Sequence, residues 1–250
     1  MGMPSIEAEY RSRTPRSAEL HERFNTRLPG GNTRSITHHL PYPLVLERGK
    51  GPLLWDVDGN SYIDLLYNYT SLVHGHAYPP IVNAIEANVG RGSVWPAGSR
   101  DQIELAELIC GRIPSIERVR FCNSGTEAGM LAAKVARAVT GRPLILKADI
   151  GYHGSYDDLE NPQTPLDKQR TVTAEFGNAE SFERLLRESG DKVAAVFLEA
   201  VVGAGGIIAG SSDFLHRVQA AAKKVGAVFV LDEVITLRLA GWIEGPDRVS

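Results

Sequence analysis

The chain has 250 residues, of which 43% are hydrophobic and 23% are charged, and its formal net charge is −3 at pH 7. This composition is typical of an ordinary globular protein with one large domain or two small ones. The slightly acidic balance gives no reason to expect a nucleic-acid partner, and no apolar run approaches the roughly 18 residues that a membrane span needs.

The first third of the chain predicts a loose start followed by short elements. Residues 1–17 are polar and charged, and residues 17–28 predict a helix that stops at Pro29 and the two glycines after it. Asp58-Gly59 predicts the turn of a hairpin within a meander. The three short strands of that meander are expected at residues 44–47, 53–56 and 61–64.

From Pro79 onward the chain alternates between helices and strands. Helices are predicted at residues 81–92, 100–113, 125–139, 179–190 and 212–226, the last capped by Ser212 or Asp213. Strands are predicted at residues 118–122, 143–147, 193–200 and 227–234. These strands are apolar throughout rather than alternating, which favours an α/β fold with a mainly parallel sheet flanked by helices.

Ligand sites in such sheets lie at the carboxyl ends of the strands, so the residues that follow each predicted strand are the first candidates. The stretch FCNSGTEA, residues 121–128, runs into a predicted helix. The free N–H groups and dipole of that helix, together with the hydroxyls of Ser124 and Thr126, suit a phosphate. The alternative is a capped helix without any ligand.

Two further strand ends carry residues that suit a ring-shaped ligand. In GYHG, residues 151–154, Tyr152 can lie flat on a planar ring, whereas the alternative is a turn with a surface tyrosine. Glu199 ends an apolar strand, and acids are rarely buried without a partner. The glycines that follow do not form a G-x-G-x-x-G dinucleotide motif, because Ile208 stands where the last glycine is needed.

Asp232 is the most informative of the candidates. It follows five apolar residues at the end of a predicted strand, where a carboxylate must be paired or functional. One function is to hold the proton of a pyridinium ring, which makes the ring an electron sink. A metal site is not expected, because no cluster of His or Cys accompanies the carboxylate. Together the four strand ends describe one ligand, pyridoxal 5'-phosphate.

These motifs, in this order, resemble the class III (subgroup II) aminotransferases of fold type I. The resemblance is to the branch of glutamate-1-semialdehyde 2,1-aminomutase and the β-amino-acid (β-phenylalanine) aminotransferases, and it runs from about Arg23 to the end of the chain. It implies that residues 1–75 form the N-terminal segment and β-meander of the small domain. Residues 76–250 would form a large cofactor-binding domain that is incomplete at its C-terminal end, with the C-terminal small domain missing.

The resemblance also implies roles for the candidate residues in holding the cofactor. Ser124, Gly125 and Thr126 match the family's phosphate-binding turn. Tyr152 matches the aromatic residue that stacks on the cofactor ring, and His153 lies beside it.

Further residues match positions around the ring and the substrate. Glu199 matches an acid near the ring hydroxyl, Asp232 matches the carboxylate paired with the pyridine nitrogen, and Val234 packs on the other ring face. Arg34, after a Pro-Gly-Gly-Asn-Thr run, resembles the arginine that faces a substrate carboxylate in the β-amino-acid branch, and Arg238 also resembles that branch.

The family's Schiff-base lysine is expected to be absent from this chain. It follows a Pro-Asp-Leu segment that GPDRVS, residues 245–250, resembles. The lysines present are expected on loops or helices outside that motif: Lys50, Lys134, Lys147, Lys168, Lys192, Lys223 and Lys224. The chain is therefore expected to be a fragment, a truncated product or a degenerate copy that is not catalytically complete alone.

The activity that the resemblance implies is transfer of an amino group from an amino acid, here a β-amino acid, to a 2-oxo acid. Two alternatives remain: a glutamate-1-semialdehyde 2,1-aminomutase, and a non-catalytic remnant that binds pyridoxal phosphate. Fold type I also implies a homodimer. Cys110 and Cys122 form no C-x-x-C pair, which favours a cytoplasmic location.

Overall fold

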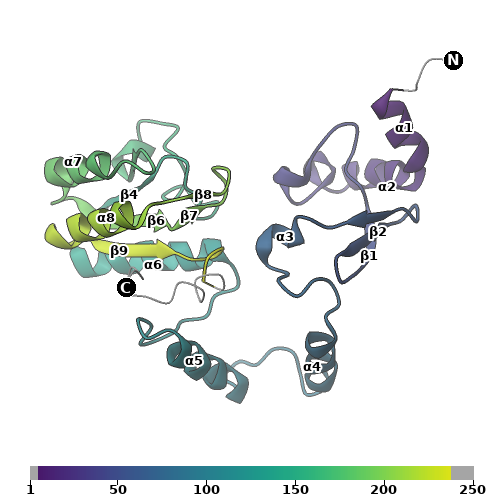
Figure 1. Cartoon of the computed structure of the whole chain (residues 1–250), viewed down its shortest axis with the longest axis horizontal. Coiled ribbons are helices and arrows are strands. Elements are labelled where there is room, and N and C mark those ends of the chain that lie inside the picture. Colours follow the sequence, from purple (N-terminus) through teal and green to yellow (C-terminus); the bar gives the residue numbers. More distant parts are fainter. Residues whose placement is uncertain (1–4, 238–250) are drawn as a thin grey trace. The chain divides into compact units, whose positions relative to one another are not determined.

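The computed structural model describes residues 5–237. The chain divides into two compact units, unit 1 at Met1–Ala97 and unit 2 at Gly98–Ser250 (Figure 1). The small-domain boundary expected at residue 75 stays a prediction. Within the described residues, no helix combines the length and apolar character needed to cross a membrane.

Unit 1 consists of short helices and a small antiparallel sheet with strand order β1-β2-β3. Its helices are α1 (Ile6–Arg13), α2 (Pro15–Asn25), α3 (Tyr67–Thr70) and α4 (Pro79–Val89), with 3₁₀ turns η1 (Pro29–Gly31) and η2 (Ser35–Thr37). Its strands are β1 (Leu46–Lys50), β2 (Leu53–Asp56) and β3 (Ser61–Ile63). The predicted meander forms, with its turn near Gly59, where φ is +89°, but β1 lies at Leu46–Lys50 rather than at the predicted residues 44–47.

Unit 2 contains a four-stranded parallel sheet with strand order β5-β4-β6-β9. Its strands are β4 (Leu144–Ala148), β5 (Thr171–Ala174), β6 (Val193–Glu199) and β9 (Val228–Asp232), and β7 (Val201–Val202) pairs separately with β8 (Ile208–Ala209). Its helices are α5 (Arg100–Arg112), α6 (Gly125–Thr140), α7 (Ala179–Ser189) and α8 (Ser212–Lys224), with a 3₁₀ turn η3 (Asp167–Gln169).

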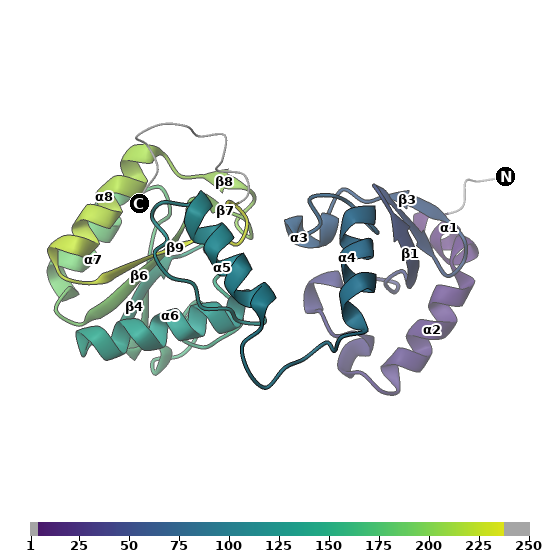
Figure 2. The same cartoon turned by 90° about the horizontal axis from the view of Figure 1, so that it is seen from below.

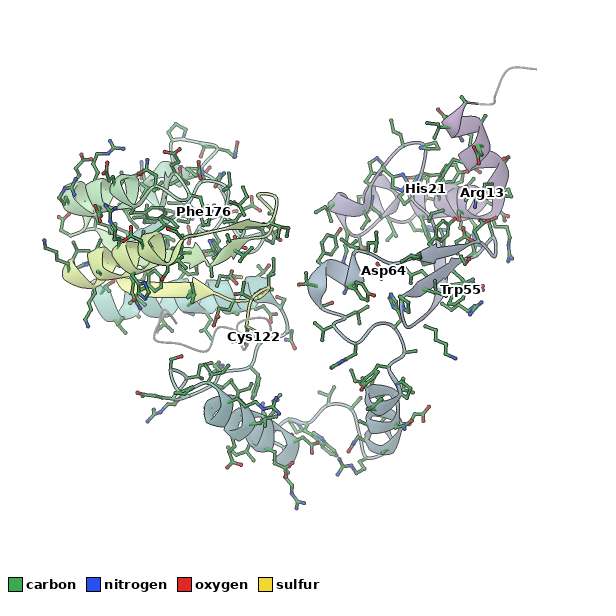
Figure 3. The ribbon with its side chains drawn as sticks, in the orientation of Figure 1. Arg13, His21, Trp55, Asp64, Cys122 and Phe176 are labelled. Atoms are coloured by element: carbon green, nitrogen blue, oxygen red, sulfur yellow. The ribbon has the colours of Figure 1, made fainter. Side chains whose placement is uncertain are left out.

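Helices cover both faces of this sheet (Figure 1, Figure 2). On one face, Phe182 of α7 and Phe214 of α8 join a buried apolar cluster with strand residues such as Leu146. Phe176 packs edge-on against Phe214, with ring centroids 5.2 Å apart, and is labelled in Figure 3. On the other face, small residues of α6 pack against the alternate strand residues, including Ile145. The predicted α/β fold with a helix-flanked parallel sheet is confirmed.

Several predicted elements differ from the structure. Residues 6–13 form α1 rather than a loose segment, because Ser5 caps the helix through the Ala8 amide and Arg11 pairs with Glu7 one turn earlier. The predicted strand at 118–122 does not form, because no described strand pairs with it and a strand needs a neighbour for its backbone hydrogen bonds.

Other differences concern element ends and short strands. The cap of α8 is Ser211, whose hydroxyl accepts from the Phe214 amide, rather than Ser212 or Asp213. Strand β5 has the short sequence Thr-Val-Thr-Ala, and the apolar pattern gave no signal for it. The two-residue strands β7 and β8 are too short for any periodicity.

Candidate active site

The predicted site residues of unit 2 gather at the carboxyl ends of β4, β6 and β9 and at the N-terminus of α6. Because the strands are parallel and paired in register, Glu199 at the end of β6 lies directly beside Asp232 at the end of β9. We call this region the rim; it comprises Ser124–Thr126, Tyr152–Gly154, Glu199, Asp232 and Val234.

Asp232 and His153 form a pair at the centre of the rim. His153 Nδ1 lies 2.9 Å from Asp232 Oδ2, and the other carboxylate oxygen accepts a hydrogen bond from the Val234 amide at 3.1 Å. The His153 side chain is fully buried, with its ring edge against Phe197. Its Nε2 has no hydrogen-bond partner among the described residues. A ring fixed in this way holds the carboxylate in one orientation.

Glu199 supports the loop that carries Tyr152. Its two carboxylate oxygens accept hydrogen bonds from the amides of Tyr152, at 3.1 Å, and Gly203, at 3.2 Å. Burial raises the pKa of Glu199 above its ordinary value, although these two bonds act in the opposite direction. The carboxyl group thus joins the loop after β4 to the loop after β6.

The N-terminus of α6 is both capped and open. Ser124 is the cap, and its hydroxyl oxygen accepts a hydrogen bond from the Glu127 amide at 3.1 Å, while Glu127 itself accepts from the Asn123 amide. The amides of Gly125 and Thr126 have no hydrogen-bond partner in residues 5–237. A capped helix therefore does not exclude a phosphate site, because two donors at the positive end of the helix remain free.

Two close approaches bring the neighbouring loops onto this helix end. A Cβ at Gly154, where φ is +111°, would lie 2.6 Å from Thr126 Oγ1, so the loop after β4 needs glycine here. The Thr126 hydroxyl also accepts a hydrogen bond from the Ser155 amide at 3.3 Å. A Cβ at Gly125 would lie 3.4 Å from Val234 Cγ2, which places the loop after β9 against the same turn.

Tyr152 and Val234 expose their side chains although their backbones are anchored at the rim. Tyr152 is 55% exposed and Val234 is 62% exposed. Tyr152 also lines a hollow of about 450 Å³ together with Ile150, Asn161 and Gly205. An aromatic ring and an aliphatic side chain are therefore both exposed at the rim.

Arg34 lies in unit 1, on the 3₁₀-rich segment after α2. Its Nη1 donates a hydrogen bond to Asn68 Oδ1 at 2.7 Å, and its guanidinium carbon lies 6.0 Å from the centre of the Tyr69 ring. It lines a hollow of about 300 Å³ with residues that include His21 and Leu44. Arg238 and the segment 245–250 lie outside the described residues.

Sequence reasoning missed Lys147. The expectation that the lysines lie on loops or helices is wrong for Lys147, which lies on β4 within the strand predicted at residues 143–147, and for Lys50, which ends β1. Lys147 is 1% exposed, and its Nζ donates to Asn161 Oδ1 at 2.6 Å. Burial lowers the pKa of its amine to about 8. The available signal was a lysine that directly continues an apolar strand, a place where charged residues are rare.

An open parallel sheet with a buried carboxylate and free amides at a helix N-terminus on its carboxyl rim defines an α/β protein, and this rim is a candidate site for an anionic ligand. Residues 35–237 match the family model of class-III aminotransferases. The chain belongs to the class-III aminotransferase family, as its motifs predict.

Similar proteins include members of both branches. The chain is 37% identical to the β-phenylalanine transaminase of Variovorax paradoxus over 230 residues, covering 90% of this chain and 52% of that protein. It is 37% identical to a glutamate-1-semialdehyde 2,1-aminomutase of Methanothermobacter thermautotrophicus over 239 residues, covering 90% and 57%.

A similar solved structure is an omega-transaminase from Sphaerobacter thermophilus, with a TM-score of 0.85 and 38% identity, covering 89% of this chain and 56% of that chain. The chain thus spans about half the length of the relatives that it matches.

Proposed function

We propose that the rim binds pyridoxal 5'-phosphate and serves amino group transfer. The observation that carries this proposal is the joint position of two features. The Asp232 carboxylate and the free amides of Gly125 and Thr126 lie at one rim, and the loop of Tyr152–Gly154 contacts both. A similar solved structure is that of a transaminase with PLP bound, which supports this cofactor.

The residues present fit the chemical demands of this cofactor. A phosphate needs N–H and O–H donors, which the amides of Gly125 and Thr126 and the Ser124 hydroxyl supply. A pyridinium nitrogen needs a carboxylate acceptor. Each oxygen of Asp232 accepts one bond in the structure and retains a second lone pair. The exposed faces of Tyr152 and Val234 suit the flat sides of a ring.

When bound, pyridoxal phosphate supplies an aldehyde that condenses with amines and a ring that accepts electrons. The protein's part is electrostatic. Asp232 would accept a hydrogen bond from the protonated ring nitrogen, and His153 donates an Nδ1–H hydrogen bond to Asp232 that holds the carboxylate in place. Glu199 anchors the Tyr152 backbone, and the side chains of Tyr152 and Val234 would cover the ring faces.

Cofactor binding is tested on the purified chain by titration with pyridoxal phosphate, followed by visible absorption before and after borohydride. Saturable binding supports the proposal, and its absence contradicts it. Amino group transfer is assayed separately with a β-amino acid donor and a 2-oxo acid acceptor. Because the chain spans about half the length of its relatives, binding without any transfer would favour the non-catalytic alternative.

For the substrate we propose a β-amino acid, whose carboxylate Arg34 binds through two parallel hydrogen bonds. The similarity to the β-phenylalanine transaminase of Variovorax paradoxus supports this choice. The chain has the same sequence identity, 37%, to a glutamate-1-semialdehyde 2,1-aminomutase, so aminomutase activity is the second candidate. In an active form of the protein, Arg34→Ala is expected to raise KM for 3-aminobutanoate about tenfold and to leave an amine without a carboxylate unaffected. Efficient turnover of glutamate-1-semialdehyde with no activity on β-amino acids would favour the aminomutase instead.

We further propose a cytoplasmic homodimer. Both Cys110 and Cys122 are free thiols, as expected in a reducing compartment. The outer face of α6 exposes Val135 and Val139, one helical turn apart, at 51% and 70%, and such a face is suited to contact with a second copy. Light scattering of the purified protein would give twice the chain mass of 27.2 kDa if this is right, and the single mass if it is wrong.

A further inference from the structure

Lys147 is a fully buried charged residue for which the proposed chemistry has no use. It lies one residue before the end of β4, paired in register with Thr173 of β5 and Phe197 of β6. Side chains alternate along a strand, so Lys147 shares the face of Ile145, the face covered by α6. Burying an amine costs free energy unless the amine has a hydrogen-bond partner, so the partner of Lys147 indicates the role of this residue.

That partner joins the two ends of a single chain segment. Lys147 Nζ donates to Asn161 Oδ1 at 2.6 Å, and Asn161 Nδ2 donates to the carbonyl oxygen of Asp149, also at 2.6 Å. Asp149 is fixed in turn, because its amide donates to the Ala174 carbonyl and its side chain accepts from the amide of Phe176.

The segment closed in this way is Asp149–Asn161, which contains no helix or strand. It carries Tyr152 and His153, the two residues that reach the rim from β4. A long irregular segment has many backbone conformations, so a clamp between its ends restricts them.

We infer that Lys147 is a positioning residue, whose buried amine clamps Asp149–Asn161 through Asn161 and thereby fixes Tyr152 and His153 at the rim. For the cofactor, this inference rests on the proposed function. An apolar side chain of similar length would fill the same space but would offer no donor to Asn161. The amine donor of Lys147, rather than the volume of its side chain, thus explains why a lysine stands at this position.

The lowered pKa agrees with this geometry. Burial brings the pKa of Lys147 down to about 8, although the carboxylates of Asp149, Glu199 and Glu160 act to raise it. A methionine at this buried position would need no desolvation of an amine, so Lys147→Met is expected to spare the fold.

The test compares four variants of the full chain by amide hydrogen exchange without any cofactor. Lys147→Met removes the donor and keeps the volume. Asn161→Ala removes the bridge, and Asn161→Asp keeps an acceptor for the amine but loses the bond to Asp149. Lys192→Met, an exposed lysine before β6, is the matched control.

The three clamp variants are expected to exchange about tenfold faster at residues 150–160, with unchanged exchange in β6 and α8 and an unchanged melting temperature. Lys192→Met should match the wild type. Wild-type exchange at 150–160 in Asn161→Ala and Asn161→Asp would overturn the inference, even if Lys147→Met failed to fold. Faster exchange throughout unit 2 would overturn it too, because it would show a merely structural role.

A second measurement distinguishes failure of the clamp inference from failure of the proposed cofactor binding. Pyridoxine 5'-phosphate lacks the aldehyde, so its affinity reports the shape of the rim alone. Its Kd is expected to rise about tenfold in the clamp variants and to stay unchanged in Lys192→Met. If the wild type does not bind it, the proposed function fails while the exchange data still decide the role of Lys147. If it binds with equal affinity to all variants, the clamp does not position the rim.

Discussion

Both units bury carboxylates, and the surroundings of these carboxylates differ. In unit 1, Asp56 is fully buried and accepts hydrogen bonds from the amides of Asp58 and Asn60, the side chain of Asn60 and the hydroxyl of Tyr62. Burial raises the pKa of Asp56, but these bonds outweigh it and hold the pKa below its ordinary value. All of these partners lie within six residues of Asp56.

Asp64, labelled in Figure 3, follows the same rule. It accepts from the amides of Leu66 and Tyr67, and His76 Nε2 lies 2.6 Å from its carboxylate. Burial raises its pKa, but the His76 bond and the two amides lower it below the ordinary value. Such carboxylates hold turns in place and have little hydrogen-bonding capacity left for a ligand.

The rim of unit 2 contrasts with this. Burial dominates at Glu199 and raises its pKa, and the buried His153 beside Asp232 leaves Nε2 without a partner among the described residues. A carboxylate whose hydrogen bonds outweigh its burial indicates a structural role, whereas a carboxyl group dominated by burial, close to a buried histidine nitrogen without a described partner, is typical of a ligand site.

The largest expected effect is on unit 1. Asp56→Ala leaves four partly buried donor groups without their acceptor and should lower the free energy of unfolding of unit 1 by about 3 kcal/mol. Amide exchange of residues 53–63 measures this loss. The exposed Asp191→Ala is the control and should stay within about 0.5 kcal/mol of the wild type. A loss below about 1 kcal/mol in Asp56→Ala would remove the contrast between the two units.

A smaller effect is expected at the helix end of the rim. Thr126→Ala removes a hydroxyl donor from the proposed phosphate site and should weaken pyridoxal phosphate binding about tenfold. Pyridoxal, which lacks the phosphate, should bind the variant as it binds the wild type. Equal weakening of both ligands would point to a general defect instead, since Thr126 also packs against Gly154.

The smallest effect concerns pH and has opposite signs in the two units. Asp56 and Asp64 have pKa values below the ordinary 3.8, so the stability they add is complete above that value and is lost as the pH falls through their folded pKa values. Glu199 has a pKa above 4.5, so its contribution is complete below 4.5 and is lost as the pH rises through its folded pKa.

This sign difference can be measured directly. Between about pH 6 and pH 3, exchange corrected for intrinsic rates should accelerate in β2 and β3 relative to β6. His153 and Asp232 also act electrostatically on Glu199, so neither residue is substituted in this comparison. The same acceleration in β6 as in β2 would show that the carboxylates of the two units do not differ.

Much of unit 2 could be predicted because its elements have strong local signals. The helix at Gly125 has a serine cap and a long apolar face, and the end of β9 was visible because Asp232 follows an apolar run. Residues 118–122 show the limit of such signals. The segment has the composition of a strand, but no described strand lies beside it to form the backbone hydrogen bonds.

The contacts of the site depend on tertiary structure and could not be predicted from spacing. His153 and Asp232 are 79 positions apart in sequence, and their contact arises because β4 and β9 flank β6. The clamp of Lys147 and Asn161 similarly joins a strand to an irregular segment that has no periodicity. Sequence patterns indicated which strand ends are candidates for a site, but the fold decides which side chains meet.

The protonation state of a bound ring nitrogen shows whether Asp232 pairs with a pyridine ring. Pyridoxine 5'-phosphate labelled at the ring nitrogen is titrated by NMR while bound to the wild type and to Asp232→Asn. We expect saturable binding to both proteins, with the nitrogen keeping its proton in the wild type to a pH at least about one unit higher than in the variant. Identical titration curves, or no saturable binding to the wild type, would contradict it.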